Sequence, residues 1–548
     1  MRLKNLLNKN LAELLVILVG SLIGFILMFG TFYEKNNTIF IAAKAWSDFA
    51  SHIPLIRSFS LGINFPPQYP LFPGEPIKYH FLFYYFVGIL EKIGLNIGLA
   101  LNIPSFLGFV FLVFIIYFFA KELFKSKAVG IISVIFFLFN SSLSYLYFFK
   151  NYSLSHLTLT QIINNKEFQS FAPYGQGLVT AFWNLNIYTN QRHLAISLAL
   201  SLTIIYLVIK PLINKKGLTS KAYAVLGIIL GLSFFLHTAV FIMTCLVIFC
   251  FALVFPKIRK NNLLLLLFAG IVTIFQYLYL TNSSGYSPHI FLGYLISGNL
   301  TIPKFIEFWI YNLGLSVVLI PLGFLFSNRT QKKVFLSFFI LFLVGNTVQF
   351  SKEIAANHKF FNFSVIVVNM FSAYALLVLW NKKKYLKPVV GILFFFMIFG
   401  GIIDFFPIYN DRKIELPDYK INKDSSWILN KTSPDSVFLN TTFLYDPASL
   451  AGRKIFMGWP YFAWSAGYDT DGRGKTMKDM LGAKDKTTAC RLLKENKIDY
   501  VEIQIQNPPD PNIPLISSLY ENDFIKSYVS KEKKYSIYRV DTNCSGIK

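Results

Sequence analysis

A polar loop between two apolar stretches holds the side chains best suited to chemistry. Asp48 and His52 are four residues apart, so on a helix they would lie on the same face. Such a pair can position a general base, or it can bind a divalent cation with a third ligand. The structural alternative is an Asp–His hydrogen bond on an interfacial helix. The loop also holds Arg57, Lys78 and His80, and this context favours a functional role for the pair.

Several short segments combine cations with imidazoles at the ends of apolar stretches. A guanidinium matches phosphate oxygens in a two-pronged geometry, although an Arg at a helix end commonly serves only as a membrane anchor. The turn-rich segment 65–76 is suited to folding back over a groove. The predicted phosphate-binding residues are His52, Arg57, Lys78, His80, Arg192, His193, His358 and Lys359.

A second group of residues could contact a sugar or an acceptor. The segment 450–469 mixes Gly, Trp and Tyr with one Arg. Aromatic rings with a few polar groups suit stacking on sugars, and an aromatic core segment is the equally good alternative. The candidate contacts are Tyr79, Glu353, Asn357, Arg453, Trp459 and Trp464.

The composition indicates a membrane protein. Of 548 residues, 54% are hydrophobic and only 15% are charged, whereas soluble domains carry about a quarter charged residues. A span needs about 20 mostly apolar residues. Eleven stretches qualify: 11–32, 99–120, 127–149, 191–210, 221–236, 238–256, 262–280, 308–327, 333–350, 362–381 and 387–408. The region 79–96 is shorter and is predicted to be an interfacial helix, and His237 is predicted to mark a helix end.

The basic residues predict the orientation. The net charge is +24, but the cations cluster between apolar stretches, which is typical of cytoplasmic loops and argues against nucleic acid as a partner. With the N-terminal cluster (Arg2, Lys4, Lys9) in the cytoplasm, the other basic clusters fall on the same side. The loops 33–98, 150–192 and 351–362 and the tail then lie outside.

The tail after residue 409 differs in composition and predicts a soluble α/β domain. Strands are expected at 436–442, 454–460, 497–505 and 534–540, with helices at 487–497 and 515–527. Cys490 and Cys544 could pair in an oxidising compartment. Cys245 and Cys250 lie in an apolar run and are expected to be inert. The domains are therefore 1–409, with its outer loop 33–98, and 410–548.

The chain resembles the GT-C superfamily of polytopic glycosyltransferases, in its protein mannosyltransferase-like and aminoarabinose transferase-like branches. The resemblance rests on one span, a large outer loop with Asp48, the run from Tyr79 to Phe124, further spans and an outer α/β tail. Two features depart from that pattern. The usual acidic pair is a single Asp preceded by Ser47, and Asn102 replaces the usual Arg before the second span.

The resemblance implies a mostly α-helical membrane enzyme that transfers a sugar from a polyprenyl-phosphate-linked donor. The acceptor would be a glycan, a lipid or a protein at the non-cytoplasmic face. Asp48 would deprotonate the acceptor hydroxyl, which attacks with inversion, and a divalent metal ion is a candidate cofactor. Two other classes stay open: a transporter or flippase for lipid-linked saccharides, and a non-catalytic cell-envelope assembly protein.

Overall fold

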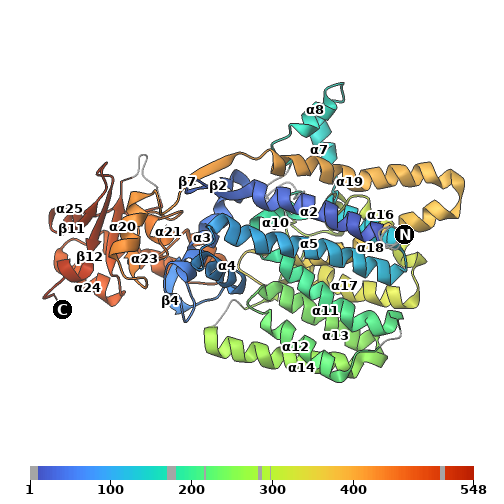
Figure 1. Cartoon of the computed structure of the whole chain (residues 1–548), viewed down its shortest axis with the longest axis horizontal. Coiled ribbons are helices and arrows are strands. Elements are labelled where there is room, and N and C mark those ends of the chain that lie inside the picture. Colours follow the sequence, from blue (N-terminus) through green and yellow to red (C-terminus); the bar gives the residue numbers. More distant parts are fainter. Residues whose placement is uncertain are drawn as a thin grey trace, which may run out of the picture.

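The structure is a computed structural model, and it describes residues 10–169, 180–214, 217–281, 287–296, 298–505 and 512–547. The N-terminal basic cluster (Arg2, Lys4, Lys9) lies outside these residues. Helices dominate, and a smaller unit that mixes strands and helices sits at one end of the helical bundle (Figure 1).

Every apolar stretch predicted from the sequence is helical, although some of the helices are broken. The stretch 127–149 divides at about residue 140, and 308–327 includes a sharp bend. The bundle helices are α2 (Leu11–Thr31), α5 (Ile97–Phe124), α6 (Lys127–Leu138), α7 (Ser144–Asn151), α11 (Leu194–Asn214), α12 (Ser220–Leu232), α13 (Thr238–Val254), α14 (Arg259–Gln276), α15 (Ile302–Leu313), α16 (Ser316–Phe326), α17 (Arg329–Thr347), α18 (His358–Lys382) and α19 (Lys387–Tyr409).

The count of eleven spans is not confirmed. Among the described residues, six helices are long and apolar enough to cross a membrane, or seven if α15 and α16, bent by 87°, form one span. Helices α6, α12 and α13 have 12, 13 and 17 residues, fewer than the roughly 20 that a straight span needs. The protein is therefore a multi-pass membrane protein with several short or broken helices. The expected break at His237 is confirmed, because α12 ends at Leu232 and α13 begins at Thr238.

Basic residues gather at the end of the bundle where α2 begins. Lys121 and Lys127 both pair with Glu13, in the first turn of α2, at 2.8 and 3.5 Å. Lys333, in the first turns of α17, donates to the carbonyl of Val254 at the end of α13. Helix ends that are distant in sequence therefore bring their cations together, as the charge pattern predicts.

The opposite end of the bundle carries the loop 33–98. It contains β1 (Phe32–Lys35), β2 (Thr38–Ala42), α3 (Trp46–Ser60), β3 (Gln68–Tyr69), β4 (Phe72–Pro76) and α4 (Leu82–Lys92). Helix α4 has 11 residues and is not a span, which agrees with the prediction of a short helix at 79–96. The short elements α8 (Thr158–Ile163), α9 (Thr180–Trp183), α10 (Asn186–Asn190), β5 (His289–Ile290) and β6 (Val348–Gln349) connect the bundle helices.

The tail forms a five-stranded mixed sheet in the order β11-β12-β10-β8-β9. The four predicted strands are β8 (Val437–Leu439), β9 (Lys454–Ile455), β10 (Tyr500–Gln504) and β12 (Tyr535–Arg539). The predicted helix 515–527 is wrong over most of its length, because only α25 (Leu519–Asn522) is helical and β11 (Lys526–Val529) adds an edge strand. The tail also contains α20 (Lys423–Lys431), α21 (Pro447–Leu450), α22 (Pro460–Ser465), α23 (Thr470–Leu481), α24 (Lys486–Glu495) and α26 (Val540–Asn543).

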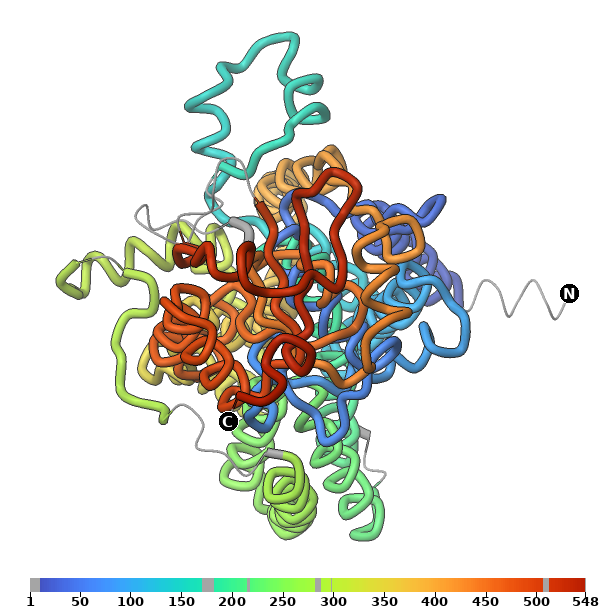
Figure 2. Tube along the Cα trace, turned by 90° about the vertical axis from the view of Figure 1, so that its left-hand side faces the viewer, coloured from blue at the N-terminus to red at the C-terminus, as the bar shows by residue number. Residues whose placement is uncertain are grey.

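The loop 33–98 and the tail are packed into one unit. Strand β7 (Lys413–Pro417) pairs antiparallel with β2, and β1 completes this three-stranded sheet. Phe49 and Ile53 of α3 lie in the same buried apolar cluster as Phe438 and Ile537 of the tail sheet. Figure 2 looks onto this end and shows the tail lying over the bundle. A boundary at residue 410 therefore separates segments of the chain that share a core.

The two tail cysteines, whose pairing the sequence left open, are joined. Cys490 and Cys544 form a disulfide with a Cα–Cα distance of 5.4 Å and a sequence separation of 54. Closing a loop of this length is worth about 4 kcal/mol by the chain-entropy argument. We expect alkylation of the denatured, unreduced protein to label Cys245 and Cys250 alone, as read by mass spectrometry. Labelling of all four thiols without reductant would contradict the pairing.

Candidate active site

Asp48 lies at the end of the bundle that carries the tail. It occupies the first turn of α3, deep in the molecule but with part of its surface still accessible. Burial raises the pKa of the Asp48 carboxyl to about 6, while the Lys359 ammonium and a hydrogen bond from Asn190 act in the opposite direction. A carboxyl in this range is ionised at neutral pH and still basic enough to accept a proton.

Lys359 comes from a distant part of the chain. It is the second residue of α18 and is half-buried, and it acts electrostatically on Asp48. Its neighbour His358 is buried, bonded through Nδ1 to Asn362 Oδ1 at 2.7 Å and stacked on Phe182. The fold therefore brings Asp48 and Lys359 together, whereas the His358 ring is held by its own helix.

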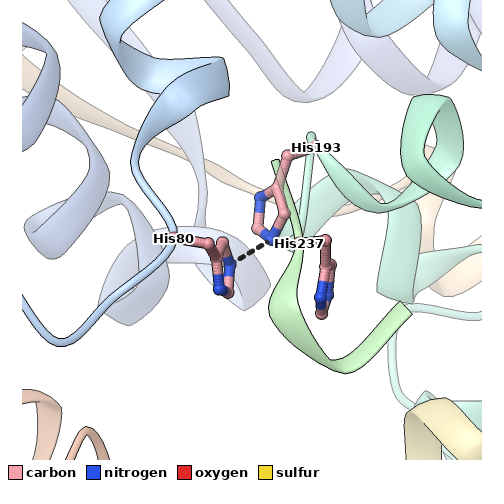
Figure 3. Close-up of side chains that lie close together, drawn as sticks. All are labelled: His80, His193 and His237. Carbon is pink, nitrogen blue, oxygen red and sulfur yellow. Dashed lines mark hydrogen bonds between the residues drawn. The ribbon is translucent and has the colours of Figure 1, made fainter. Parts of the chain in front are cut away.

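Three histidines converge beside this pair (Figure 3). His80 precedes α4, His193 precedes α11, and His237 precedes α13, so three short connections supply one ring each. One ring nitrogen of each lies within 4.8 Å of the other two. The Nε2 atoms of His80 and His193 are 2.7 Å apart, and the His80 and His237 rings stack with centroids 4.5 Å apart.

Two tyrosines join the histidines to Asp48. The Tyr84 hydroxyl lies 2.9 Å from His193 Nδ1 and is also hydrogen-bonded to Tyr79. The Tyr79 ring stacks on His80 at 3.9 Å. The Asp48 carboxylate acts electrostatically on both hydroxyls. Tyr79, Tyr84, His80 and His193 are therefore in contact with one another, and Asp48 acts on the two tyrosines through its charge.

The imidazoles of this site do not supply positive charge. Burial lowers the pKa of His52 to about 3, and it lowers the pKa of His80 and of His193 well below the usual value for histidine. These rings are neutral at pH 7, so they can donate or accept hydrogen bonds or ligate a metal. The positive charge that acts electrostatically on Asp48 comes from the Lys359 ammonium.

Arg57 has a structural partner set and does not fit the phosphate role predicted from the sequence. Its guanidinium is fully buried and bonds to Glu91 at 2.9 Å and to Asp418 at 3.0 Å. The same group stacks on Tyr419. A guanidinium enclosed by two carboxylates is not accessible to a lipid phosphate. We therefore no longer propose Arg57 as a ligand of the donor phosphate.

Two further arginines are also enclosed. Arg192 donates to Thr189, Met28, Thr31 and Asn102, which ties α2 and α5 to the connection before α11. Arg453 donates to three carbonyls of the tail, to the Leu61 carbonyl and to the Thr432 hydroxyl. Both side chains are at most 1% exposed. Both guanidinium groups stabilise the fold, and neither is available to bind a ligand.

The remaining predicted contacts are dispersed. Lys78 pairs with Glu75 at 3.0 Å and lies over the Tyr468 ring. Asn357 donates to two carbonyls at the end of α17, and Glu353 accepts from Tyr461 of the tail. The aromatic residues Trp459 and Trp464 neighbour Phe443 and Tyr461, respectively. None of these contacts involves Asp48.

Four residues of this region were not singled out for the site by sequence reasoning: Tyr84, Asn190, His237 and Asp404. Asp404 is buried in α19, where the Ser144 hydroxyl donates a hydrogen bond to it. His237 carried a signal, because a histidine that interrupts an apolar run is unusual in a membrane segment. Tyr84 and Asn190 carried none, because single tyrosines and asparagines are common at helix ends.

Comparison with known proteins identifies the fold. No protein-family model and no curated protein matches the sequence. Solved structures of the oligosaccharyltransferase of Archaeoglobus fulgidus do match. Its complex with Zn and sulfate is 13% identical, with a TM-score of 0.52 over 96% of this chain and 73% of that one.

Two other structures of that enzyme match similarly. The complex of AglB with an inhibitory peptide and a dolichol-phosphate is 12% identical, with a TM-score of 0.50 over 97% of this chain and 74% of that one. The form tethered to an acceptor peptide with the NVT sequon is 12% identical, with a TM-score of 0.51 and the same coverage. The resemblance read from the sequence is confirmed at the level of fold: this chain has the GT-C fold of an archaeal oligosaccharyltransferase.

Proposed function

We propose that the protein is a membrane glycosyltransferase that uses a polyprenyl-phosphate-linked sugar at the non-cytoplasmic face. The observation that carries this proposal is the half-buried Asp48 carboxylate, on which the Lys359 ammonium acts electrostatically, in a GT-C fold. The similar enzyme binds dolichol-phosphate and an acceptor peptide, which supports a lipid-linked donor. The N-terminus would be cytoplasmic and the tail outside, because the basic residues gather at the end where α2 begins.

In the proposed reaction, the acceptor hydroxyl attacks the anomeric carbon of the donor. Its proton passes to the Asp48 carboxylate, and the bond between the anomeric carbon and the phosphate oxygen breaks with inversion. The leaving group is a polyprenyl phosphate, and the Lys359 ammonium neutralises it. The N-termini of α11, α13 and α18 carry partial positive charge beside the same group of residues. The protein, lipid or glycan nature of the acceptor is left to experiment.

Two alternative functions give different outcomes in the same test. Purified protein in vesicles would be given a radiolabelled polyprenyl-phosphate sugar and a mixture of acceptors. Covalent transfer supports the enzyme. Translocation of the lipid without transfer supports a flippase, for which the buried Asp404 is the best-placed ionisable group. If the purified protein shows neither transfer nor translocation, the result supports a non-catalytic assembly protein.

The pH dependence of transfer tests the pairing of Asp48 with Lys359. Since Asp48 must be ionised to act as a base, kcat/KM should fall about tenfold per pH unit below pH 6. The Lys359 ammonium lowers the pKa of Asp48, so Lys359→Met should move this limb to higher pH. The exposed Lys431 provides the control, and Lys431→Met should leave the profile in place. If the fall of kcat/KM at low pH stays at the same pH in Lys359→Met, the electrostatic pairing of Asp48 with Lys359 is contradicted.

A further inference from the structure

We infer that His80, His193 and His237 form a metal site for Zn²⁺ or a similar borderline transition-metal ion. All three are imidazoles, and the cluster includes no carboxylate. Imidazole ligands suit Zn, Cu, Fe and Ni, whereas Mg²⁺ and Ca²⁺ prefer oxygen ligands. The chemistry of the ligand set therefore specifies the class of metal, which the sequence left open.

The distances fit such an ion with small movements. With zinc–nitrogen bonds of about 2.0–2.1 Å, tetrahedral geometry places ligand nitrogens about 3.3 Å apart. The Nε2 atoms of His80 and His193 are closer than this, at 2.7 Å, and the three candidate ligand atoms all lie within 4.8 Å of one another. The rings belong to three connections between helices and not to one rigid element, so rotations of the side chains can equalise the distances.

His237 supplies an independent reason to expect a ligand. Its side chain is 2% exposed, and neither ring nitrogen has a hydrogen-bond partner among the described residues. A buried polar group without a partner costs about 1–3 kcal/mol. A metal ion held by one of these nitrogens would remove most of that cost.

Tyr84 completes the arrangement as a positioning residue. Its hydroxyl contacts His193 Nδ1 at 2.9 Å, which leaves Nε2 as the atom that faces His80. Metal-binding histidines almost always have their second nitrogen fixed in this way, and loss of the partner weakens metal binding about 10–100-fold. With three protein ligands, an open position remains for an oxygen atom. On the proposed function, that oxygen would belong to the donor phosphate.

One nearby charge opposes cation binding and makes the inference more testable. Lys359 acts electrostatically on all three imidazoles. A bound dication is repelled by this ammonium, so Lys359→Met should tighten Zn²⁺ binding. A site formed by unrelated surface histidines would not respond to that substitution.

The test is Zn²⁺ binding to full-length protein purified with a histidine-free tag and stripped with a chelator. We expect one Zn²⁺ per chain by elemental analysis and calorimetry. His237→Ala and His193→Ala should weaken binding at least about 100-fold, Tyr84→Phe about 10–100-fold, and the exposed control His156→Ala not at all. Co²⁺ substitution should give the visible absorption of a four-coordinate site in the wild type and in His156→Ala, but not in His237→Ala or His193→Ala.

Wild-type binding that is absent, or that survives in His237→Ala as in His156→Ala, would overturn the inference. If the alanine variants do not fold, Tyr84→Phe and Lys359→Met still decide it, because they should change the affinity in opposite directions. The assay contains no sugar donor, so its failure would be distinct from a failure of the proposed transfer reaction.

Discussion

Replacing Asp48 with Asn is expected to reduce sugar transfer by about 10²–10⁴-fold while the protein stays folded. Asn has nearly the same shape but cannot accept the acceptor proton, and a positioned general base contributes about this much. The measurement is initial-rate transfer with a radiolabelled polyprenyl-phosphate donor. Asp541→Asn, an exposed change of the same kind in the tail, should be silent. Full activity in Asp48→Asn would remove Asp48 from the mechanism.

The same variant carries a stability signature that a purely structural aspartate would not show. Burial raises the pKa of Asp48 from 3.8 to about 6. The folded state therefore binds its proton more tightly than the unfolded state, and ionisation between these values costs stability as the pH rises. Asp48→Asn should consequently raise the melting temperature at pH 8, with little effect at pH 4. A functional group held at the expense of stability behaves in this way.

Arg57→Leu is expected to have the largest effect on stability, about 3–5 kcal/mol. The substitution leaves Glu91 and Asp418 buried without their shared cation and removes a link between α3, α4 and the tail. Thermal unfolding of detergent-purified protein measures the effect. Lys78→Met is the control, because its pair with Glu75 is partly exposed and such pairs are worth at most about 1 kcal/mol.

The outcome for Arg57→Leu also separates two roles. A large loss of thermal stability agrees with the buried ion group described here. Unchanged stability with lost transfer would instead restore Arg57 as a ligand of the donor phosphate, the role that the sequence alone indicated.

The parts of the site that could be predicted from sequence are those with a local cause. Asp48 and His52 share one helix because α3 covers both, and Tyr79 and His80 fall in the connection that leads into α4. The clustering of basic residues predicted which helix ends lie together. The length of the apolar stretches predicted where the helices of the bundle lie. The span count failed because apolar length does not reveal a bend such as the one between α15 and α16.

The remaining features depend on contacts between distant segments. Arg57 and Asp418 are 361 residues apart, and no local pattern indicates that the two neutralise each other. His237 lies 157 positions after His80, and only the packing of α13 against neighbouring helices brings the rings together. The strand at Lys526–Val529 forms because β12 offers an open edge, although the local sequence has helical periodicity.

The packing of the loop 33–98 against the tail has a practical consequence for engineered chimeras. Strand β7 completes the sheet begun by β1 and β2, and α3 contributes to the same apolar cluster as the tail strands. Grafting a foreign tail alone would replace one half of a matched interface and disturb the helix that bears Asp48. The unit to transplant between homologues is the pair 33–98 and 410–548, moved together onto the recipient's helices.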